Sequence, residues 1–358
     1  MIMRDKILFG DCRNTLKQFD EKARMCVTSP PYYGLRDYGT ATWIGGDPNC
    51  NHMRDSKVNP DQCITGHKNH DQMAGVGDAI YKTSCPKCGA VRQDSQIGLE
   101  ETPEKYIEEM VKVFRLVRDN LTDDGTLWLN IGDSYYNYRS DGNYPKQTVS
   151  KTRQDLPTKT PVRGNKLKGL KQKDLIGIPW MLAFALRADG WYLRQDIIWH
   201  KPNPMPESVK DRCTKSHEYI FLLSKSKNYY YDNEAIKEPA KDWGTRNRNN
   251  GKYHNQGTGL QPHSGLTKSY AKKNKRSVWS VTTKPFKGAH FAVFPPELIE
   301  PCIKAGSEVG DIILDPFMGS GTTAMVSKML DRYYIGCELS ENYNNLIQER
   351  VPINVSYL

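Results

Sequence analysis

The sequence contains no run of apolar residues long enough to cross a bilayer, and its mean hydropathy is −0.70. A membrane-spanning helix needs about 20 consecutive, mostly apolar residues. The N-terminal residues, Met1 to Lys6, also lack the apolar core of a signal peptide. With 358 residues, the chain is long enough to bury one large core or two smaller ones. We therefore expect a soluble cytoplasmic protein with no membrane contact.

The sequence also lacks the signature of a disulfide framework. Its nine cysteines are an odd number scattered along a long chain, whereas disulfide-rich domains are short and their cysteines pair. Reduced thiols or a metal site are the alternatives. Two cysteines in the segment Cys85-Pro-Lys-Cys88 have the spacing of a zinc knuckle, and Gly89 eases the turn that follows.

A second close pair, Cys50 and His52, precedes that knuckle. Four soft ligands suit tetrahedral zinc, and a polar segment with little core gains most from such a metal. We predict a structural Zn²⁺ ion bound by Cys50, His52, Cys85 and Cys88 in an insert at residues 47–97. The intervening segment contains three rival ligands: Cys63, His67 and His70.

Acidic residues are scarce in two segments, which hold the excess positive charge of a chain with a net charge of +10. Residues 137–173 carry +8 and residues 234–287 carry +9, which leaves −7 for the rest. Aromatic side chains and one histidine are interleaved with these charges: Tyr138, Tyr144, Trp243, Tyr253, His254 and Tyr270. A solvated loop explains either segment alone, but the two together favour a polyanion such as nucleic acid as the partner.

Strand-like and helix-like segments alternate along the remainder of the chain. The predicted strands are residues 6–10, 24–28, 126–131, 191–199, 219–223, 311–314 and 333–337. The predicted helices are residues 13–19, 106–120, 178–188, 296–304 and 322–330. This alternation favours an α/β fold with a doubly wound, mostly parallel, Rossmann-like sheet.

A phosphate-binding loop is missing, although a glycine-rich turn is present. The segment Asp315-Pro-Phe-Met-Gly-Ser-Gly-Thr322 lies between a predicted strand and a predicted helix, without a Gly-Lys-Ser/Thr ending or a third spaced glycine. Gly319 and Gly321 allow a ligand to approach the backbone. Glu338 ends the next strand, where an acid binds ribose hydroxyls in nucleotide-binding sheets. The pattern predicts a nucleoside ligand without a pyrophosphate, and S-adenosylmethionine meets both conditions.

A second turn, Ser29-Pro30-Pro31-Tyr32, ends the strand predicted at residues 24–28. The amino group of a nucleobase is a poor nucleophile because its lone pair is delocalised into the ring, so methylating it requires acceptors for its N–H groups. The Ser29 hydroxyl and a carbonyl of this rigid turn can be such acceptors. Tyr32 can stack on a base taken out of the duplex. This turn is therefore the candidate catalytic site.

Together, the two turns resemble the motifs of the DNA amino-methyltransferases, which form N4-methylcytosine or N6-methyladenine from S-adenosylmethionine. The resemblance covers most of the chain, and the catalytic motif comes first, as in the beta arrangement of that family. It implies that Ser29 and Pro30 accept the amino protons, that Pro31 completes the motif and that Tyr32 stacks on the flipped base. The residues that it implies for S-adenosylmethionine are Asp11, Phe294, Pro295, Asp315, Phe317, Gly319, Gly321, Thr322, Thr323 and Glu338.

The resemblance further implies double-stranded DNA as the substrate, in a bacterial or phage-infected cell, and it is consistent with a cognate restriction endonuclease as a partner. The two halves of the core are predicted at residues 1–46 with 98–136 and at residues 288–358, joined by residues 174–232. Residues 137–173 form a basic loop insert, and residues 233–287 occupy the place of the target-recognition region. The candidate DNA contacts are His200, Lys201, Asn203, Arg246 and Arg248.

Several alternatives remain open at the level of sequence. A serine at position 29 favours N4 of cytosine, and N6 of adenine is the alternative. Methylation of C5 requires a cysteine nucleophile, but Cys302 falls within the predicted helix 296–304, where a buried structural thiol is expected. A non-catalytic, zinc-containing DNA-binding protein would leave the glycine-rich turn and Glu338 unexplained. An RNA or protein-glutamine methyltransferase shares a related motif, but Ser29 and the basic inserts favour DNA.

Overall fold

The computed structural model describes residues 4–34, 41–53, 81, 84–137, 167–240, 271–284 and 294–351. It divides into two compact units, of which one comprises Met1–Pro30 with Ile107–Leu358 and the other Pro31–Tyr106. The predicted DNA contacts Arg246 and Arg248 and the rival metal ligands lie outside the described residues. In the part of the chain that is described, no helix is long and apolar enough to cross a membrane.

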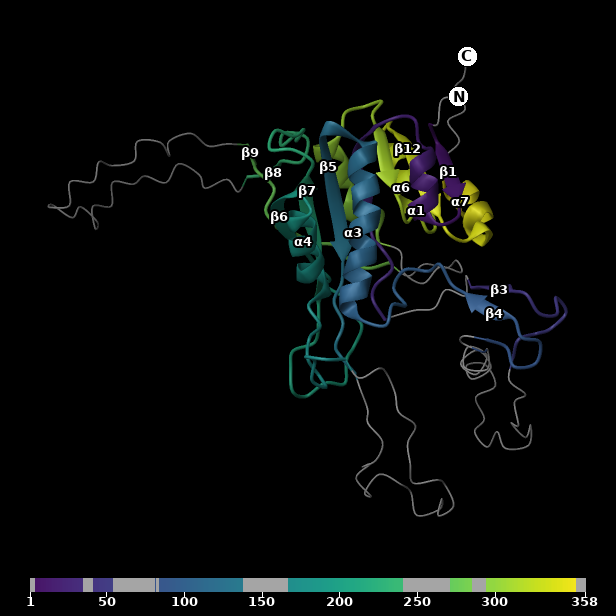
Figure 1. The fold of residues 1–358 in the computed structure, drawn as a ribbon. Helices are drawn as coiled ribbons and strands as arrows, with labels where there is room; N and C mark the ends of the chain where they lie inside the picture. The colour runs from purple at the N-terminus through teal and green to yellow at the C-terminus, as the bar shows by residue number, and fades with distance from the viewer. Residues whose placement is uncertain are drawn as a thin grey trace, which may run out of the picture. The chain divides into compact units, whose positions relative to one another are not determined.

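The first unit is built on a central sheet. Its strands, in spatial order, are β1 (Lys6–Phe9), β12 (Tyr333–Glu338), β11 (Ile312–Asp315), β2 (Ala23–Thr28), β5 (Leu121–Ile131), β7 (His217–Ser224), β6 (Tyr192–His200) and β10 (Val278–Ser280). Among these described strands, only β7 runs antiparallel to its neighbours. The prediction of a mostly parallel, Rossmann-like sheet is therefore confirmed (Figure 1).

Helices pack on this sheet because each presents an apolar stripe. Helix α5 (Pro296–Gly306) contacts β2 and β5, and it also packs against α6 (Thr322–Met329). A Cβ atom on Gly306 would lie 2.8 Å from the Met25 sulfur and 3.0 Å from Nε1 of Trp128, so the end of α5 lies directly on the sheet. Leu127 and Leu129 alternate with Trp128 in β5 and therefore face the opposite side of the sheet.

Three further helices bury apolar side chains, such as Phe114 and Leu182, and are also linked by ion pairs. They are α1 (Cys12–Thr15), α3 (Pro103–Asn120) and α4 (Ile178–Ala188). Arg13 of α1 pairs with Glu109 of α3, and Arg115 of α3 pairs with Asp189, the residue that caps α4. The last helix that the structure describes is α7 (Asn344–Arg350), which follows a short 3₁₀ helix, Glu341–Tyr343.

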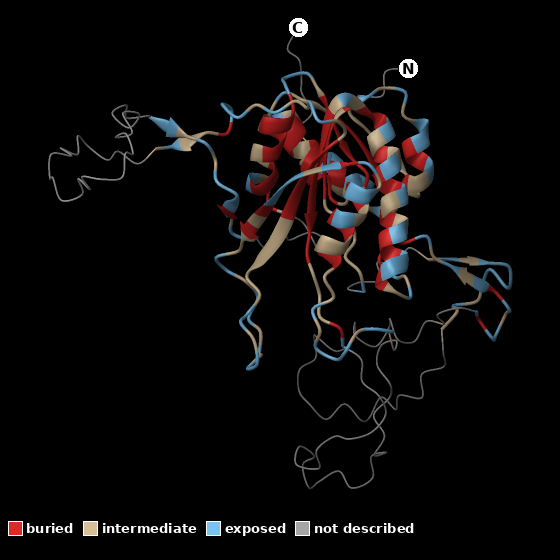
Figure 2. Ribbon diagram, turned by 60° about the vertical axis from the view of Figure 1, so that its left-hand side comes forward, coloured by how far each residue is buried: buried red, intermediate tan, exposed pale blue. Residues whose placement is uncertain are grey.

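A large apolar cluster lies between the sheet and α5. Figure 2 shows the buried residues concentrated in the strands, while the helices expose one face to solvent. The buried members of the cluster are Met25, Val27, Trp128, Ile197, Trp199, Ile220, Leu222, Ile236, Trp279, Leu298, Ile299, Cys302, Ile303, Ala305, Ile313 and Val326. Cys302 is thus a buried core residue, as the sequence predicted.

One local prediction differs from the structure. Residues 122–125 are expected to form a turn before a strand at residues 126–131, but they lie within β5. The β2–β5 ladder pairs Ala23 with Leu121 and then Met25 with Thr126, so β5 accommodates extra residues at an irregularity. A Cβ atom on Gly125 would lie 2.9 Å from Cβ of Leu121, which only glycine avoids at this position.

The Pro31–Tyr106 unit contains a small antiparallel pair, β3 (Thr42–Ile44) with β4 (Val91–Gln93). The register places Trp43 opposite Arg92. A second short antiparallel pair belongs to the first unit and joins β8 (Glu238–Pro239) to β9 (Lys272–Lys273). Both of these strands lie within the predicted target-recognition region, residues 233–287.

Candidate active site and metal cluster

The two sequence motifs follow neighbouring strands. Parallel strands end at the same edge of a sheet, and β2 and β11 are adjacent. From β2 the core continues to β5 on one side, and from β11 it continues to β12 on the other, so this is a topological switch point, where open α/β sheets bind ligands. The turn that begins at Ser29 and the glycine-rich loop after Asp315 both start there. Thr28 and Asp315, the residues at these strand ends, are 287 positions apart and share a hydrogen bond.

The glycine-rich loop has the backbone shape that its glycines allow. Gly319 and Gly321 have φ values of 55° and 81°, and Gly321 caps α6. These are left-handed conformations, which glycine adopts without steric cost. A Cβ atom on Gly321 would also lie 3.1 Å from Cγ2 of Ile347 in α7. The first turn of α6 therefore presents its N–H groups next to a tight, side-chain-free bend.

Glu338 ends β12 and supports the loop from the adjacent strand. Its Oε2 accepts the N–H of Gly319 at 2.8 Å, and its Oε1 accepts the N–H of Ser340 at 2.9 Å. Burial raises the pKa of Glu338, while these two N–H donors act in the opposite direction. Each carboxylate oxygen has capacity for a further hydrogen bond, so the chemistry of Glu338 fits the two hydroxyls of a ribose.

Asp315 is held more completely than the resemblance suggests. Its side chain accepts hydrogen bonds from the hydroxyl of Thr28 at 2.6 Å, from the N–H of Phe317 at 3.0 Å and from the hydroxyl of Thr323 at 2.6 Å. Burial raises the pKa of Asp315 to about 6 even though these donors lower it. The described contacts of its carboxylate are therefore contacts within the protein.

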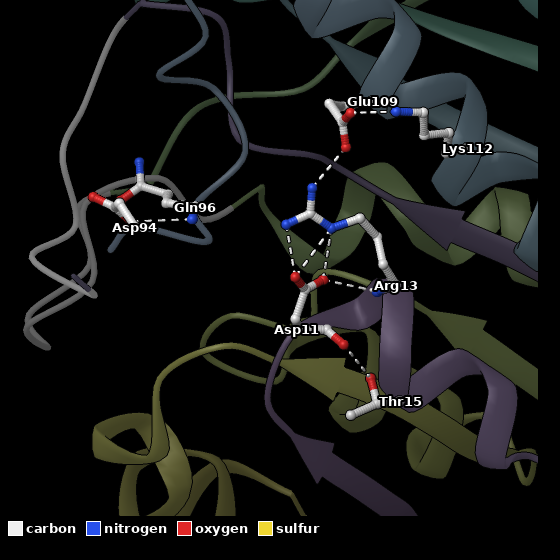
Figure 3. Close-up of polar contacts among 7 residues, drawn as sticks. All are labelled: Asp11, Arg13, Thr15, Asp94, Gln96, Glu109 and Lys112. Carbon is white, nitrogen blue, oxygen red and sulfur yellow. Dashed lines mark hydrogen bonds and ion pairs between the residues drawn. The ribbon is translucent and has the colours of Figure 1, made fainter. Parts of the chain in front are cut away.

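Asp11 caps α1 and is clamped by an arginine of the same helix (Figure 3). Its Oδ1 accepts the backbone N–H of Arg13 at 2.9 Å, and its Oδ2 accepts Nη2 of Arg13 at 2.6 Å. The guanidinium also reaches Oε2 of Glu109 at 2.6 Å, and Glu109 in turn binds Lys112. The hydrogen bonds that the Asp11 carboxylate accepts from the guanidinium are the largest influence that raises the pKa of Arg13. The sequence did not single out this clamp.

The remaining predicted cofactor residues flank these groups. Phe294 packs against the large apolar cluster, and Pro295 caps α5. Phe317 is half-buried. The Thr322 hydroxyl accepts Nη2 of Arg350 at 3.1 Å.

Arg350 is a site residue that the sequence reasoning missed. It projects from α7 to the loop, where its Nη1 donates to the carbonyl of Ser320 at 2.7 Å and also contacts the Ser320 hydroxyl. Ile347, which lies against Gly321, precedes Arg350 by three residues, so both occupy one helix face. That spacing was the available signal, but nothing in the sequence indicates the loop as their partner.

The candidate catalytic turn, residues 29–32, includes the boundary between the two units, after Pro30. Ser29 is half-buried and Pro30 is buried. Within the Pro31–Tyr106 unit, the carbonyl of Pro31 accepts the Tyr106 hydroxyl at 2.9 Å. A Cβ atom on Gly98 would lie 3.1 Å from the carbonyl oxygen of Tyr32, so only glycine leaves this oxygen its space. The Pro31 carbonyl thus has one donor within the protein and, like any carbonyl oxygen, can accept a second hydrogen bond.

The predicted DNA contacts at the end of β6 have partners inside the protein. Lys201 forms an ion pair with Glu218 of β7 and lies 4.2 Å from the ring centroid of Trp199. Asn203 donates to the Thr283 carbonyl at 3.0 Å and accepts the Thr283 N–H at 3.0 Å. Nδ1 of the third, His200, lies 3.0 Å from the Ser280 hydroxyl. These side chains tie β6 to β7 and to the β10 segment at the carboxyl edge of the sheet.

The four predicted metal ligands come together in the Pro31–Tyr106 unit. All four ligand atoms lie within 4.8 Å of one another. The Cys50 and Cys85 sulfurs are 3.8 Å apart, and the Cys88 sulfur is 3.5 Å from Nδ1 of His52. With Zn–S bonds of about 2.3 Å and Zn–N bonds of about 2.0 Å, a tetrahedral ion gives edges of about 3.8 Å and 3.5 Å. The donor set therefore fits zinc.

The surroundings of the cluster act on two of its thiols in opposite directions. The pKa of the Cys50 thiol is raised: the backbone N–H of His52 lowers it, but burial and hydrogen bonds with Cys88 and Cys85 outweigh that effect. The backbone N–H of Ala90 lowers the pKa of the Cys88 thiol, and the thiolate is the form that binds zinc. The Trp43 ring stacks on His52 with a centroid distance of 4.2 Å. A Cβ atom on Gly46 would lie 2.8 Å from the Cys88 sulfur, so the backbone approaches the cluster closely at this glycine.

Comparisons with known proteins identify the family. A DNA methylase family model (N6_N4_Mtase) matches residues 23–349. The chain belongs to this DNA methylase family. Its resemblance to the DNA amino-methyltransferases is thereby confirmed, and with it the enzyme class, a DNA methyltransferase for cytosine N4 or adenine N6. The match begins after Asp11, so it does not include that residue.

Individual relatives agree with this assignment. Type II methyltransferase M.SmaI of Serratia marcescens is 42% identical and covers 97% of this chain and 90% of its own. Type II methyltransferase M.XycI of Xanthomonas campestris pv. cyanopsidis is 40% identical, and the alignment covers 98% of this chain and 89% of that relative. The solved PvuII DNA methyltransferase (cytosine-N4-specific) superimposes with a TM-score of 0.53 over 98% of this chain and 87% of its own. At 15% sequence identity, that superposition shows the fold alone.

Proposed function

We propose that this DNA methyltransferase transfers the methyl group of S-adenosylmethionine to N4 of a cytosine that is flipped out of double-stranded DNA. The observation that carries the proposal is the adjacency of the two motifs at the switch point, where the residues before them, Thr28 and Asp315, are hydrogen-bonded. Residue 29 is the reason for preferring cytosine, because its neutral hydroxyl takes the place of the carboxylate more common for adenine. N6 of adenine is the second candidate.

The chain's own groups account for the chemistry at the amino nitrogen. S-adenosylmethionine, when bound, supplies an electrophilic methyl group. The Ser29 hydroxyl and the Pro30 carbonyl accept the two N–H groups of the target amine and hold its lone pair toward that methyl group. Tyr32 stacks on the extruded base and replaces the stacking lost from the duplex. The proton released from the methylated nitrogen passes to solvent by way of the Ser29 hydroxyl.

The test is methyl transfer from labelled S-adenosylmethionine to DNA, RNA and protein, followed by nucleoside analysis of the DNA. We expect N4-methyldeoxycytidine as the only methylated product. N6-methyldeoxyadenosine alone would overturn the preference for cytosine, and labelling of RNA or protein without DNA would overturn the substrate class. Ser29→Ala should lower kcat by about 100-fold, since one positioned polar group at a reacting centre is worth about that much.

For the cofactor, we propose that Glu338 binds the ribose hydroxyls and that Gly319, Gly321 and the first turn of α6 surround the rest. The other proposed contacts are Asp11, Phe294, Pro295, Asp315, Phe317, Thr322 and Thr323. Glu338→Gln keeps the shape of the side chain but removes its charge, so we expect a higher Kd for S-adenosylmethionine, measured by calorimetry. An unchanged Kd would assign Glu338 to support of the loop alone.

We propose that the basic segments bind DNA, with Arg246 and Arg248 as contacts. Three further proposed contacts lie at the end of β6 and just after it: His200, Lys201 and Asn203. Support comes from the charges of +8 and +9 in residues 137–173 and 234–287. Lys contacts to phosphate predict a steep fall of affinity with salt. A cognate restriction endonuclease is the proposed biological partner, and DNA from cells that express the methyltransferase should resist it.

We also propose that Cys50, His52, Cys85 and Cys88 bind one structural zinc ion. The donor set leaves no open coordination position, so zinc would stabilise the fold rather than act in methyl transfer. Elemental analysis of freshly purified protein should give about one zinc per chain, and Cys88→Ser should lose it. Metal-free protein with full activity and stability would contradict the proposal.

A further inference from the structure

One buried hydrogen bond joins the two motifs at the switch point. The hydroxyl of Thr28, the last residue of β2, donates to Oδ1 of Asp315, the last residue of β11, at 2.6 Å. The ladder between these strands pairs Met25 with Ile313 and Cys26 with Leu314. The side-chain bond thus continues the link between the strands beyond these backbone pairs. Thr28 is 0% and Asp315 1% exposed, so the bond is shielded from solvent.

Asp315 passes this link on to the glycine-rich loop. The N–H of Phe317 and the hydroxyl of Thr323 donate to Oδ1 and Oδ2 of the same carboxylate, at 3.0 Å and 2.6 Å. Thr323 is a fully buried residue in the first turn of α6. Hydroxyl-to-carboxylate distances of about 2.6 Å are typical of strong, charge-assisted bonds. One carboxylate therefore holds the end of β2, the turn after β11 and the start of α6.

These three points carry the groups that must meet during the reaction. Thr28 precedes Ser29 directly, and α6 begins at the loop proposed for the cofactor. We propose that Thr28 is a positioning residue whose hydroxyl, through Asp315, fixes the catalytic turn relative to the cofactor loop. This inference rests on the proposed function. An error of about 1 Å in such an arrangement can lower the rate about 100-fold, which is the effect that the bond prevents.

The charge of Asp315 gives the inference a distinctive signature. Its pKa is raised to about 6 by burial, and the hydroxyls of Thr28 and Thr323 act against that shift because they donate to the ionised form. Removing the Thr28 hydroxyl therefore raises the pKa further. The side chains and the backbone N–H whose charge or hydrogen bond acts on this carboxylate are Thr28, Thr323, the N–H of Phe317, Glu338, Cys26 and Cys337.

Thr28→Val tests the proposal, because valine keeps the shape of threonine and lacks the hydroxyl. We expect kcat to fall by about 10- to 100-fold with little change in KM for S-adenosylmethionine. In the wild type, kcat should fall at acid pH as Asp315 becomes protonated, near pH 6. In Thr28→Val this fall should occur at higher pH. A wild type that transfers no methyl group to DNA contradicts the proposed function. An active wild type with an unaltered Thr28→Val contradicts only the positioning role.

Two controls separate positioning from packing. Thr28→Ser and Thr28→Ala differ by the hydroxyl alone, so Ser should retain the wild-type pH profile and most of kcat, whereas Ala should behave like Val. This pair decides the matter even if Val does not fold. Thr126→Val removes a buried hydroxyl from the neighbouring strand β5, where Thr126 pairs with Met25 and binds Trp128. Equal losses in Ser and Ala, or the same pH shift in Thr126→Val, would overturn the proposal.

Discussion

The part of the central sheet around β11 and β12 and the Pro31–Tyr106 unit are each held together by different interactions. In the first, apolar side chains such as Leu314 and Ile335 are fully buried between strands and helices. In the second, the described residues contribute few buried apolar side chains, namely Cys85, Ala90, Ile97 and Tyr106. The same unit brings four metal-ligand atoms within 4.8 Å of one another. The described residues of this unit form little core, and the metal-ligand cluster offers them a further source of stability.

Loss of the proposed zinc ion should therefore affect the two regions very differently. Chelation or Cys88→Ser should unfold residues 84–100, because a structural zinc site contributes about 10 kcal/mol or more to folding. Hydrogen exchange should show lost protection there and retained protection in β11 and β12. Cys213→Ser is the matched control, since Cys213 is an exposed free cysteine that should leave the metal content unchanged. Retained protection of residues 84–100 in metal-free protein would contradict this difference.

The opposite experiment targets the apolar core. Trp128 is 1% exposed and lies against α5, so Trp128→Ala should lower the free energy of unfolding by about 3–5 kcal/mol. Urea denaturation measures this change, and the zinc content should stay the same. Trp43→Ala is the counterpart in the other unit, where the ring stacks on His52. It should weaken metal binding and leave the core transition unchanged, and the reverse pattern would show that the two regions are not independent.

A smaller effect is expected where the core supports the glycine-rich loop that we propose binds the cofactor. Arg350→Met removes hydrogen bonds to Ser320 and Thr322, so stability should fall by about 1–3 kcal/mol and KM for S-adenosylmethionine should rise. Arg332 is a matched control, because it also donates to a backbone carbonyl and a serine hydroxyl, both of Ser307. Arg332→Met should lower stability similarly without changing KM. A KM that rises equally in both variants would indicate general destabilisation instead.

Local patterns predicted several elements closely. The helix expected at residues 178–188 is α4, Ile178–Ala188, and the strand expected at residues 333–337 is β12, Tyr333–Glu338. Apolar spacing and end signals within one segment determine such elements. Helix α7 was not predicted. It packs on the glycine-rich loop, which lies earlier in the sequence, and no local sequence pattern links the helix to that loop.

The partners of individual side chains could be predicted from the sequence less well than the helices and strands. The prediction that Asp11 contacts the cofactor stays a prediction, but its observed partner is Arg13, which in turn reaches Glu109 in another helix. Asp11 and Arg13 are only two positions apart, and this spacing did not indicate an ion pair, since an arginine in the first turn of a helix is ordinarily solvated. The partner from α3 depends on how the helices pack on the sheet.

By itself, the sequence determined the chemistry that each motif offers: acceptors on a rigid turn at Ser29 and Pro30, a glycine-rich loop with a following acid, and four soft metal ligands. These properties reside in residue type and spacing, which need no partner. Only the tertiary structure decided that Thr28 and Asp315, 287 positions apart, share a hydrogen bond. It also decided that the Pro31 carbonyl accepts a hydrogen bond from the Tyr106 hydroxyl. Such contacts depend on the order of the strands in the sheet and on how the helices pack against it. Both are set by the burial of the two faces of the sheet, which involves residues from the whole chain.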